Sequence, residues 1–353
     1  MAEKVLIKGN EAIGRAAIAA GCRHYFGYPI TPQTEIAEFL SKELPKVNGT
    51  FIQAESEIAA INMVYGAAAA GARAMTSSSG PGISLKQEGI STMAAAQVPC
   101  VIVDIMRGGP GLGSIQPGQP DYFQIVKGGG HGDYHNIVLA PNSVQEMYDL
   151  TFEAFDISDK YRNPVFVLAD GALGQMMEPV SLGEKSDSLP QKPWALTGKP
   201  HNRERHLIKS LNLAPEIEED HNLLLQAKYK KILQAVRRYE GYKLEDAELI
   251  LVAYGISARI AQSAVDMTRK QGIKAGLFRP ITLWPFPDVE LLAAAEQARY
   301  LLTVELSAGQ MVEDVRLATK CRKPVHFYGR MGGMLPTPQE VLVEILKICQ
   351  GGD

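Results

Sequence analysis

The chain has 353 residues, with 36 Lys and Arg against 39 Asp and Glu and a formal net charge of −3. Its length is sufficient for two or three domains with separate cores, and its charge balance excludes a broad basic surface for nucleic acid or for a membrane. No apolar run approaches the roughly 20 residues that a membrane-spanning helix needs, so we expect small molecules or proteins as partners.

Apolar runs of strand length alternate with segments of helix length over the first 180 residues. The expected strands are KVLIK (4–8), HYFGYP (24–29), GTFIQA (49–54), RAMTSS (73–78), CVIVDIM (100–106), NIVLAP (136–141) and PVFVLAD (164–170). The expected helices are 10–21, 32–43, 57–71, 82–96 and 142–158. This alternation predicts a parallel, doubly wound α/β sheet with helices on both faces.

The pattern ends near residue 180, where a polar, Pro-containing segment (184–206) has the composition of a linker or surface arm. A second α/β unit follows, with a first helix at 221–239. Its expected strands are AELILVAYG (247–255), IKAGLFRPITLWPFP (273–287), YLLTVEL (300–306) and PVHFYG (324–329), and its other helices are 257–271, 288–297, 309–320 and 338–349. We therefore divide the chain into domains at 1–184 and 246–353, with an arm at 185–245.

Four strand ends have unusual sequences: GYPITP (27–32), AESE (54–57), SSSGPG (77–82) and MRGGPGLG (106–113). Ligands of open α/β sheets bind beyond the carboxyl ends of the strands, so these ends are the candidate site.

The AESE end carries two acids, Glu55 and Glu57, before a segment of mainly Ala, Gly, Ile and Met. The helix macrodipole favours an anion at this position, and this alone explains Glu55. For Glu57 we favour a functional role, because a carboxyl group in an apolar pocket can share a proton with the ring nitrogen of a ligand.

The other three ends have a structural and a functional interpretation each. SSSGPG is either a plain helix cap or an anion cradle, and without a GxSxG pattern it does not predict a serine nucleophile. Arg107 is either a surface ion-pair partner or a bidentate carboxylate binder. Thr31, between Pro29 and Pro32, either is an ordinary residue of a proline-containing turn or presents a hydroxyl that the two prolines hold in a fixed position.

The remaining candidate metal ligands do not predict a metal site. His131 and His135 lie in a glycine-rich loop, which argues against a metal pair. The cysteines are far apart, at Cys22, Cys100, Cys321 and Cys349. We therefore expect reduced cysteines in a cytoplasmic protein, with no zinc or iron–sulfur cluster on this chain. The amino terminus has charged residues within its apolar pattern and is not expected to be a signal peptide.

Taken together and in this order, the four strand ends resemble the pyrimidine-binding (alpha) subunit of the thiamine-diphosphate-dependent 2-oxoacid:ferredoxin oxidoreductases. The resemblance extends over residues 9–36, 51–90, 99–113 and 136–170. FRPITLWPFP (278–287) and TVELSAGQMVEDV (303–315) are similar to the transketolase C-terminal-like domain of the same family. The resemblance implies a doubly wound pyrimidine-binding domain followed by this smaller α/β domain.

The resemblance also implies roles for individual residues. Glu57 would hydrogen-bond a nitrogen of the cofactor's aminopyrimidine ring and so promote removal of the thiazolium proton. Thr31 and Arg107 would hold the carboxylate of the substrate, and Tyr28, Pro29, Ile30 and Thr31 would wall the ring pocket. A carboxylate fixed in a water-poor site favours loss of carbon dioxide through orientation and desolvation.

No Gly-Asp-Gly…Asn pattern for magnesium and diphosphate occurs in the chain, and it has no clustered cysteines for electron relay. The resemblance implies that a beta subunit holds the diphosphate, Mg²⁺ and a [4Fe-4S] cluster. A gamma subunit and a ferredoxin-like delta subunit would complete a complex that converts a 2-oxoacid and coenzyme A to acyl-CoA, carbon dioxide and reduced ferredoxin. This chain would supply half of the active site.

The motifs at 55–72 and 106–113 look closest to the branched-chain, 2-oxoisovalerate type, with the 2-oxoglutarate type as the near alternative. Two other functions are considered: a non-catalytic scaffold, and half of a non-oxidative thiamine decarboxylase or transketolase-like enzyme. Thr31, Glu57 and Arg107 argue against the scaffold, because a scaffold needs none of the three.

Overall fold

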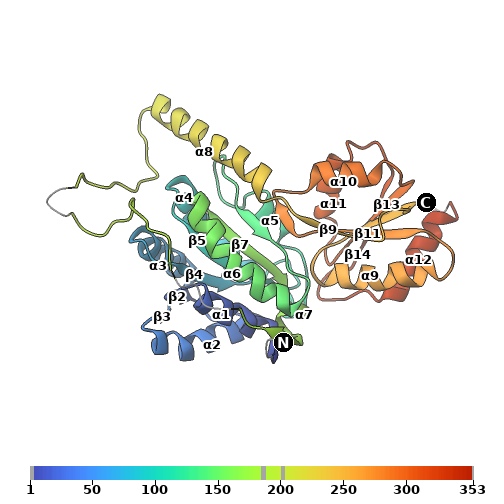
Figure 1. Ribbon diagram of the computed structural model, residues 1–353, viewed down its shortest axis with the longest axis horizontal. Coiled ribbons are helices and arrows are strands. Elements are labelled where there is room, and N and C mark those ends of the chain that lie inside the picture. Colours follow the sequence, from blue (N-terminus) through green and yellow to red (C-terminus); the bar gives the residue numbers. More distant parts are fainter. Residues whose placement is uncertain (1–3, 184–187, 200–202, 352–353) are drawn as a thin grey trace.

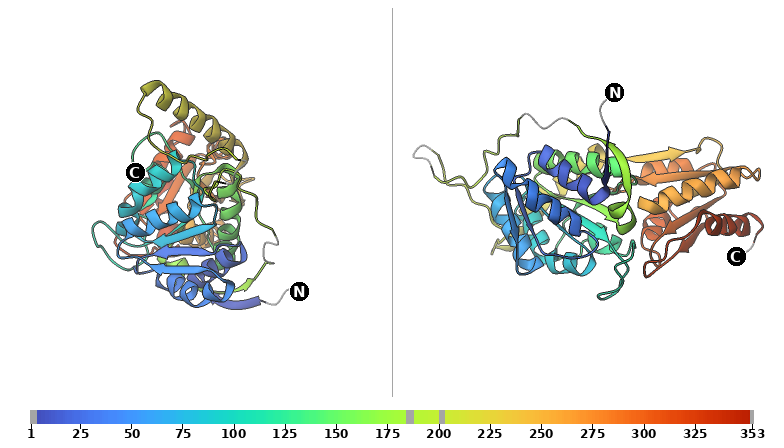
Figure 2. Two further views of the ribbon diagram at one scale, coloured as in Figure 1. Left: turned by 90° about the vertical axis from the view of Figure 1, so that its left-hand side faces the viewer. Right: turned by 90° about the horizontal axis from the view of Figure 1, so that it is seen from below.

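Two twisted sheets lie side by side along the molecule in the computed structural model, which describes residues 4–183, 188–199 and 203–351 (Figure 1 and Figure 2). The first sheet has the strand order β12-β6-β7-β5-β4-β2-β3. Its parallel strands are β2 (His24–Gly27), β3 (Thr50–Gln53), β4 (Ala74–Ser78), β5 (Cys100–Met106), β6 (Ile137–Leu139) and β7 (Pro164–Asp170). β4, β5 and β7 are buried along their whole length, as apolar strands covered on both faces should be.

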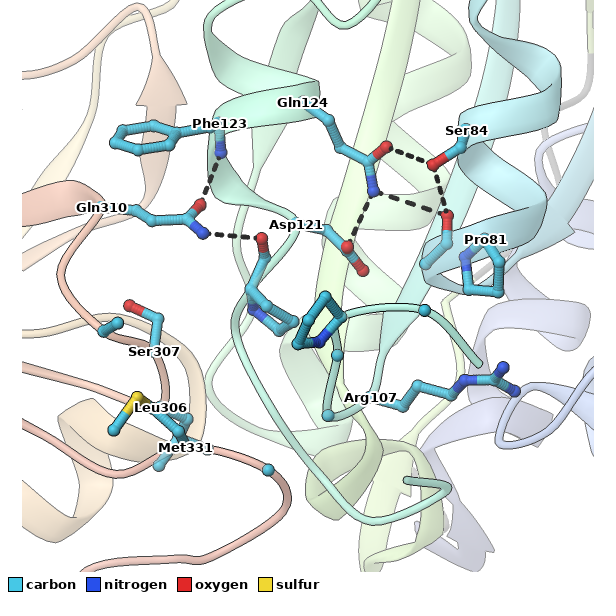
Figure 3. Close-up of a pocket in the computed structure, with 18 residues that line it drawn as sticks. Pro81, Ser84, Arg107, Asp121, Phe123, Gln124, Leu306, Ser307, Gln310 and Met331 are labelled. Carbon is cyan, nitrogen blue, oxygen red and sulfur yellow. Dashed lines mark hydrogen bonds between the residues drawn. The ribbon is translucent and has the colours of Figure 1, made fainter. Parts of the chain in front are cut away.

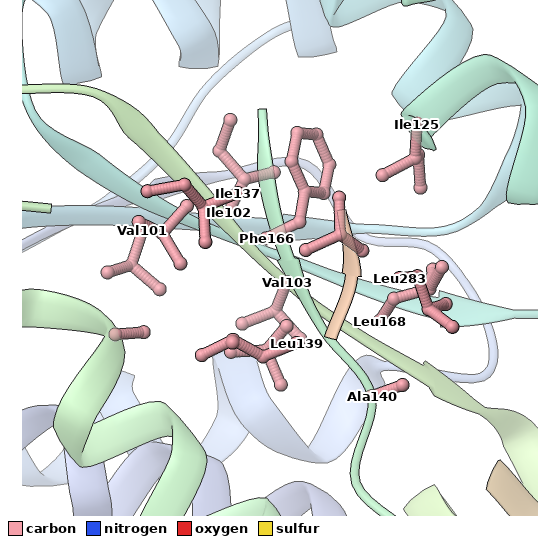
Figure 4. Packing of buried hydrophobic residues seen from close by; sticks show 14 of the residues in the cluster. Val101, Ile102, Val103, Ile125, Ile137, Leu139, Ala140, Phe166, Leu168 and Leu283 are labelled. Atoms are coloured by element: carbon pink, nitrogen blue, oxygen red, sulfur yellow. The ribbon is translucent and has the colours of Figure 1, made fainter. Parts of the chain in front are cut away.

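Helices cover both faces of this sheet, which confirms the predicted doubly wound fold (Figure 1). α1 (Gly9–Ala19) packs on α6 (Val144–Tyr161), which lies against β5 and β7, and α2 (Thr34–Glu43) packs on α1. On the other face, α3 (Glu57–Ala69) packs on α4 (Gly80–Ala95). Short helices complete the unit at η1 (Pro45–Val47), α5 (Tyr122–Val126) and α7 (Gly171–Gln175). Side chains of β5, β6 and β7 form the centre of the core, with Leu283 of β12 and Ile125 of α5 beside them (Figure 4).

The first expected strand lies outside this sheet. β1 (Lys4–Lys8) instead forms a separate antiparallel ribbon with β8 (Met177–Ser181). An inner strand of a parallel sheet is apolar on both faces, whereas this run begins and ends with a lysine, Lys4 and Lys8, and its Lys4 and Leu6 side chains are exposed in the ribbon.

The second sheet has the strand order β14-β13-β10-β11-β9. It consists of β10 (Leu249–Val252), β11 (Ala275–Pro280), β13 (Tyr300–Glu305) and β14 (Val325–Gly329), which are parallel, and β9 (Tyr239–Tyr242), which is antiparallel to β11. α9 (Gly255–Arg269) packs on α12 (Pro338–Cys349), and α10 (Asp288–Ala295) packs on α11 (Met311–Ala318). The expected second α/β unit is therefore present.

Two elements cross between the predicted domains. β12 (Thr282–Trp284) follows β11 directly but pairs antiparallel with β6 of the first sheet. α8 (Pro215–Ala235) lies along the first domain, although the sequence places it at the start of the second unit (Figure 1). The ring of its Tyr229 meets the ring of Trp284 edge-on. The domain division at 184 and 246 stays a prediction, and these contacts tie the arm and the second unit to the first.

Hydrogen bonds between buried groups also join the two units. The side chain of Gln119 accepts from the backbone N–H of Leu306 at 3.0 Å and donates to the carbonyl of Tyr254 at 3.0 Å. The Asp170 carboxylate caps α7 and accepts from the backbone N–H of Ile256 in α9 at 2.9 Å. The carboxyl ends of the first sheet thus face the second unit.

Candidate active site at the carboxyl ends of the strands

The loop after β2 is held by buried polar side chains of neighbouring elements. Gln33 donates to the carbonyl of Tyr28 at 3.3 Å and accepts from the Ser77 hydroxyl at 2.5 Å. Asn10 donates to the carbonyl of Pro32 at 2.8 Å. These contacts fix both ends of the Tyr28–Thr31 turn, so its position does not depend on proline alone.

Glu57 is the first residue of α3, where Ser56 caps the helix by accepting from the Ala59 N–H at 3.2 Å. The structure separates the two acids of this strand end: Glu57 is 6% exposed, whereas Glu55 is exposed to solvent. Within the described residues, the Glu57 carboxylate has no hydrogen bond or ion pair. It is a buried acid that lines a cavity and lacks a partner, which is what a ligand-binding acid requires.

This cavity, the ring cavity, has a volume of about 460 Å³. It is lined by Tyr28, Pro29, Ile30, Thr31, Thr34, Glu57, Pro81, Gly82, Leu85, Arg107 and Leu112. All six residues singled out from the sequence are therefore brought together, because the carboxyl ends of parallel strands meet at one edge of the sheet. Leu85 was not singled out, and its position three residues after Gly82 on one helix face is the signal that could have indicated it.

Arg107 lies between the loop after β2 and its own glycine-rich loop, and it is 8% exposed. Its guanidinium donates to the carbonyl of Thr31 and to that of Leu112, both at 2.9 Å. Its Nε–H has no partner among the described residues. The side chain is thus held in place by backbone oxygens and still has donor capacity for an anion.

A second cavity, the junction cavity, has a volume of about 610 Å³ and lies between the two units (Figure 3). Arg107 and Pro81 line both cavities. From the second unit, Leu306, Ser307 and Gln310 contribute to its wall. Sequence reasoning missed this cavity, because the wall forms only when the end of β13 is packed against the first domain.

Gln310 fastens that wall to the first domain. Its amide accepts from the backbone N–H of Phe123 and donates to the carbonyl of Pro120, both at 2.8 Å (Figure 3). The buried carboxylate of Glu305 accepts from the first N–H groups of α11 and from the Ser307 hydroxyl. Burial raises the pKa of Glu305, and these hydrogen bonds oppose that shift.

The chain matches two models of one protein family. Residues 15–240 match the model of the pyruvate flavodoxin/ferredoxin oxidoreductase, thiamine diphosphate-binding domain, and residues 247–341 match core domain II of pyruvate:ferredoxin oxidoreductase. The chain belongs to the 2-oxoacid:ferredoxin oxidoreductase family. The resemblance inferred from the strand ends is thereby confirmed.

Two curated relatives match along nearly their whole length. The ketoisovalerate oxidoreductase subunit VorB of Methanothermobacter marburgensis is 55% identical, over 98% of this chain and 97% of the relative. The 2-oxoglutarate synthase subunit KorA of Archaeoglobus fulgidus is 40% identical, over 98% of this chain and 99% of the relative. Both are named as subunits, so this family builds multi-subunit complexes.

Solved structures agree with the fold. The 2-oxoglutarate:ferredoxin oxidoreductase from Magnetococcus marinus, with 2-oxoglutarate, coenzyme A and succinyl-CoA bound, matches with a TM-score of 0.88 and 27% identity. That match covers 98% of this chain, which spans 65% of the Magnetococcus chain. A split-gene transketolase matches with a TM-score of 0.60 at 15% identity and supports the fold alone.

Two observations show that the ring cavity suits the thiamine diphosphate named by the family model. The cavity has an unpartnered carboxylate, Glu57, at a buried position, and most of its other lining is apolar or aromatic. A heteroaromatic ring with one hydrogen-bonding nitrogen satisfies both features. Glu57 would hold that nitrogen, with the Tyr28–Ile30 turn along the ring.

The remaining candidates lie away from this cavity. His135 stacks on Trp284 with ring centroids 4.6 Å apart, so it is part of the packing between β12 and α8. Among the residues that the structure describes, no group of three or more His, Cys, Asp or Glu side chains could hold a metal ion. No described helix is long and apolar enough to cross a membrane. Cys22 and Cys100 are buried, Cys321 and Cys349 are exposed, and all four are unpaired.

Proposed function

We propose that this chain is the pyrimidine-binding subunit of a cytoplasmic 2-oxoisovalerate:ferredoxin oxidoreductase. The complex would convert a branched-chain 2-oxoacid and coenzyme A to acyl-CoA, carbon dioxide and reduced ferredoxin. The observation that carries the proposal is the unpartnered, buried Glu57 carboxylate on a cavity that also contains Arg107 and the Tyr28–Thr31 turn.

Each residue has one task in this proposal. Glu57 exchanges a proton with the ring nitrogen of thiamine diphosphate. When bound, this cofactor would supply the carbon nucleophile. Arg107 and Thr31 anchor the carboxylate of the 2-oxoacid, and the apolar wall excludes water, so that decarboxylation is favoured by orientation. A partner beta subunit would hold the diphosphate with Mg²⁺ and carry a [4Fe-4S] cluster, with gamma and ferredoxin-like delta subunits completing the complex.

Two observations favour a branched-chain substrate over 2-oxoglutarate. Identity to the ketoisovalerate relative is 55%, against 40% for the 2-oxoglutarate relative. Ile30, Leu85 and Leu112 line the ring cavity, and Arg107 is the one cation in that lining among the described residues. An aliphatic side chain suits this wall, whereas the second carboxylate of 2-oxoglutarate would find no second cation in the described lining of this cavity.

The test is anaerobic co-purification with the partner subunits, followed by turnover of a panel of 2-oxoacids with ferredoxin. We expect Glu57→Gln to lower kcat by a factor on the order of 10²–10⁴, because a general acid–base group contributes about that much. Glu55→Gln is the matched control, an exposed acid two residues earlier, and should keep the normal rate. Full activity of the isolated chain, or a normal rate in Glu57→Gln, would refute the proposal.

A further inference from the structure

A lysine lies buried behind the ring cavity. Lys86 of α4 is fully buried, and its ammonium donates to the carbonyl of Ser77 at a long 3.5 Å. This is the one hydrogen bond of that ammonium within the described residues. Since an ammonium has three donors and a large cost of desolvation, a buried lysine held by one weak contact requires another reason to be there.

The backbone geometry places this lysine on the helix face that meets Glu57. Gly82 lies four residues before Lys86 in α4, and residues four apart share a helix face. A Cβ placed on Gly82 would lie 2.5 Å from Oε1 of Glu57 and 2.1 Å from the hydroxyl of Ser78. The α4 face that carries Lys86 is therefore the face in contact with the Glu57 carboxylate. Asp104 is level with Ser78 on the neighbouring strand, β5.

The charges around Lys86 agree with this geometry. Burial lowers the pKa of Lys86 to about 8, while the carboxylates of Glu57 from α3 and Asp104 from β5 oppose the shift. Lys86 thus carries a positive charge at neutral pH. Burial also raises the pKa of Asp104 and of Asp121, and a carboxyl group that holds a proton competes less for the lysine.

We propose that Lys86 is a positioning residue for Glu57, whose ammonium biases the proton shared between Glu57 and the ring nitrogen of thiamine diphosphate toward the ring. The inference rests on the proposed function. A neighbouring cation stabilises the carboxylate over the carboxylic acid, so the proton moves from the Glu57 oxygen to the ring nitrogen more readily. No other bond forms or breaks in this step.

The test uses Lys86→Met in the assembled, thiamine-diphosphate-loaded complex, with Lys86→Gln as a second variant that keeps a polar group. The control is Lys228→Met. Lys228 also donates to one backbone carbonyl, at 3.2 Å, and burial lowers its pKa to about 7. It lies on α8, however, and no carboxylate of the described residues contributes to its pKa shift. The main readout is hydrogen–deuterium exchange of the thiazolium proton in the absence of substrate.

We expect both Lys86 variants to slow this exchange by roughly tenfold or more, the effect of losing an opposite charge beside a carboxyl group. Lys228→Met should leave the exchange rate unchanged. In the unmodified complex, kcat should fall as the pH rises through about 8, where Lys86 loses its charge, and this fall should be absent in Lys86→Met. A residue with only a packing role would not change that pH profile.

A second readout uses the full chain without cofactor. Between about 8 and the ordinary lysine pKa, 10.5, the unfolded chain binds more protons than the folded chain, so stability rises with pH. In the unmodified chain, the contribution of Lys86 should raise the folding equilibrium constant by roughly 300-fold over this window, and in Lys86→Met this contribution should be absent. Persistence of the full rise would show that Lys86 is not the buried charge inferred here and would overturn the proposal.

The outcomes separate the two proposals. If the unmodified complex binds thiamine diphosphate and turns over a 2-oxoacid, but the Lys86 variants exchange the thiazolium proton at the normal rate, this inference alone is overturned. If the unmodified complex binds no thiamine diphosphate, the proposed function fails and this inference fails with it.

Discussion

Gly82→Ala adds one methyl group, and the effect of that group on Glu57 can be worked out from the structure. The new Cβ would lie 2.5 Å from Oε1 of Glu57 and 2.1 Å from the hydroxyl of Ser78. Both are ends of side chains, so the backbone can keep its position while the carboxylate moves. An ordinary contact needs about 3.5 Å, and Glu57 must therefore move by about 1 Å.

A displacement of about 1 Å at a reacting group can lower the rate by about 10²-fold. We therefore expect Gly82→Ala to reduce kcat of the assembled complex by about that factor, measured as anaerobic ferredoxin reduction with 2-oxoisovalerate and coenzyme A. Replacing glycine by alanine within a helix stabilises by about 0.5–1 kcal/mol, which opposes the cost of moving the Ser78 and Glu57 side chains. We therefore expect only a small change in the melting temperature.

Gly66→Ala is the matched control. Gly66 lies in α3, the helix that Glu57 begins, and apart from the surrounding backbone of that helix no atom of the described residues lies within 4 Å of the Cβ that this substitution would add. We expect normal turnover and unchanged or slightly higher stability. Normal turnover in Gly82→Ala would refute the placement of Glu57 at the reaction centre. Equal losses in both variants would show that the effect comes from helix stability.

Two further predictions concern Arg107 and Asp170. Arg107→Lys should raise KM for the 2-oxoacid by roughly tenfold or more. One ammonium cannot reproduce the two 2.9 Å contacts of the guanidinium and still bind an anion. An unchanged KM would contradict the role of Arg107 as the carboxylate anchor. Burial raises the pKa of Asp170 to about 6, so the folded chain binds more protons than the unfolded chain between 3.8 and that value. Stability should fall by up to about 3 kcal/mol as the pH rises through this window, and urea unfolding of Asp170→Asn should show no such fall.

The first sheet and the ring cavity were predictable because they depend on local patterns. Apolar runs of strand length define β4, β5 and β7, and parallel strands necessarily bring their carboxyl ends to one edge. Glu57 could be preferred over Glu55 because it is followed directly by an apolar helix, and the structure buries only Glu57.

The missed features all depend on contacts between distant segments. β1 has an apolar run of strand length, but it pairs with the distant strand β8 and stays outside the first sheet. The pairing of β12 with β6 and the junction cavity require the second unit to be in place. Lys86 lies in a segment that predicts a helix correctly, but the sequence does not show which face meets Glu57.

The crossing of β12 has a consequence for dividing the polypeptide. β12 covers the outer edge of β6 in the first sheet, although it is encoded after β11 of the second. A fragment that ends at residue 246 would leave the backbone groups of β6 open to pairing with another molecule, which is a route to aggregation. The amino-terminal half should therefore be produced in soluble form only when the later half is supplied with it.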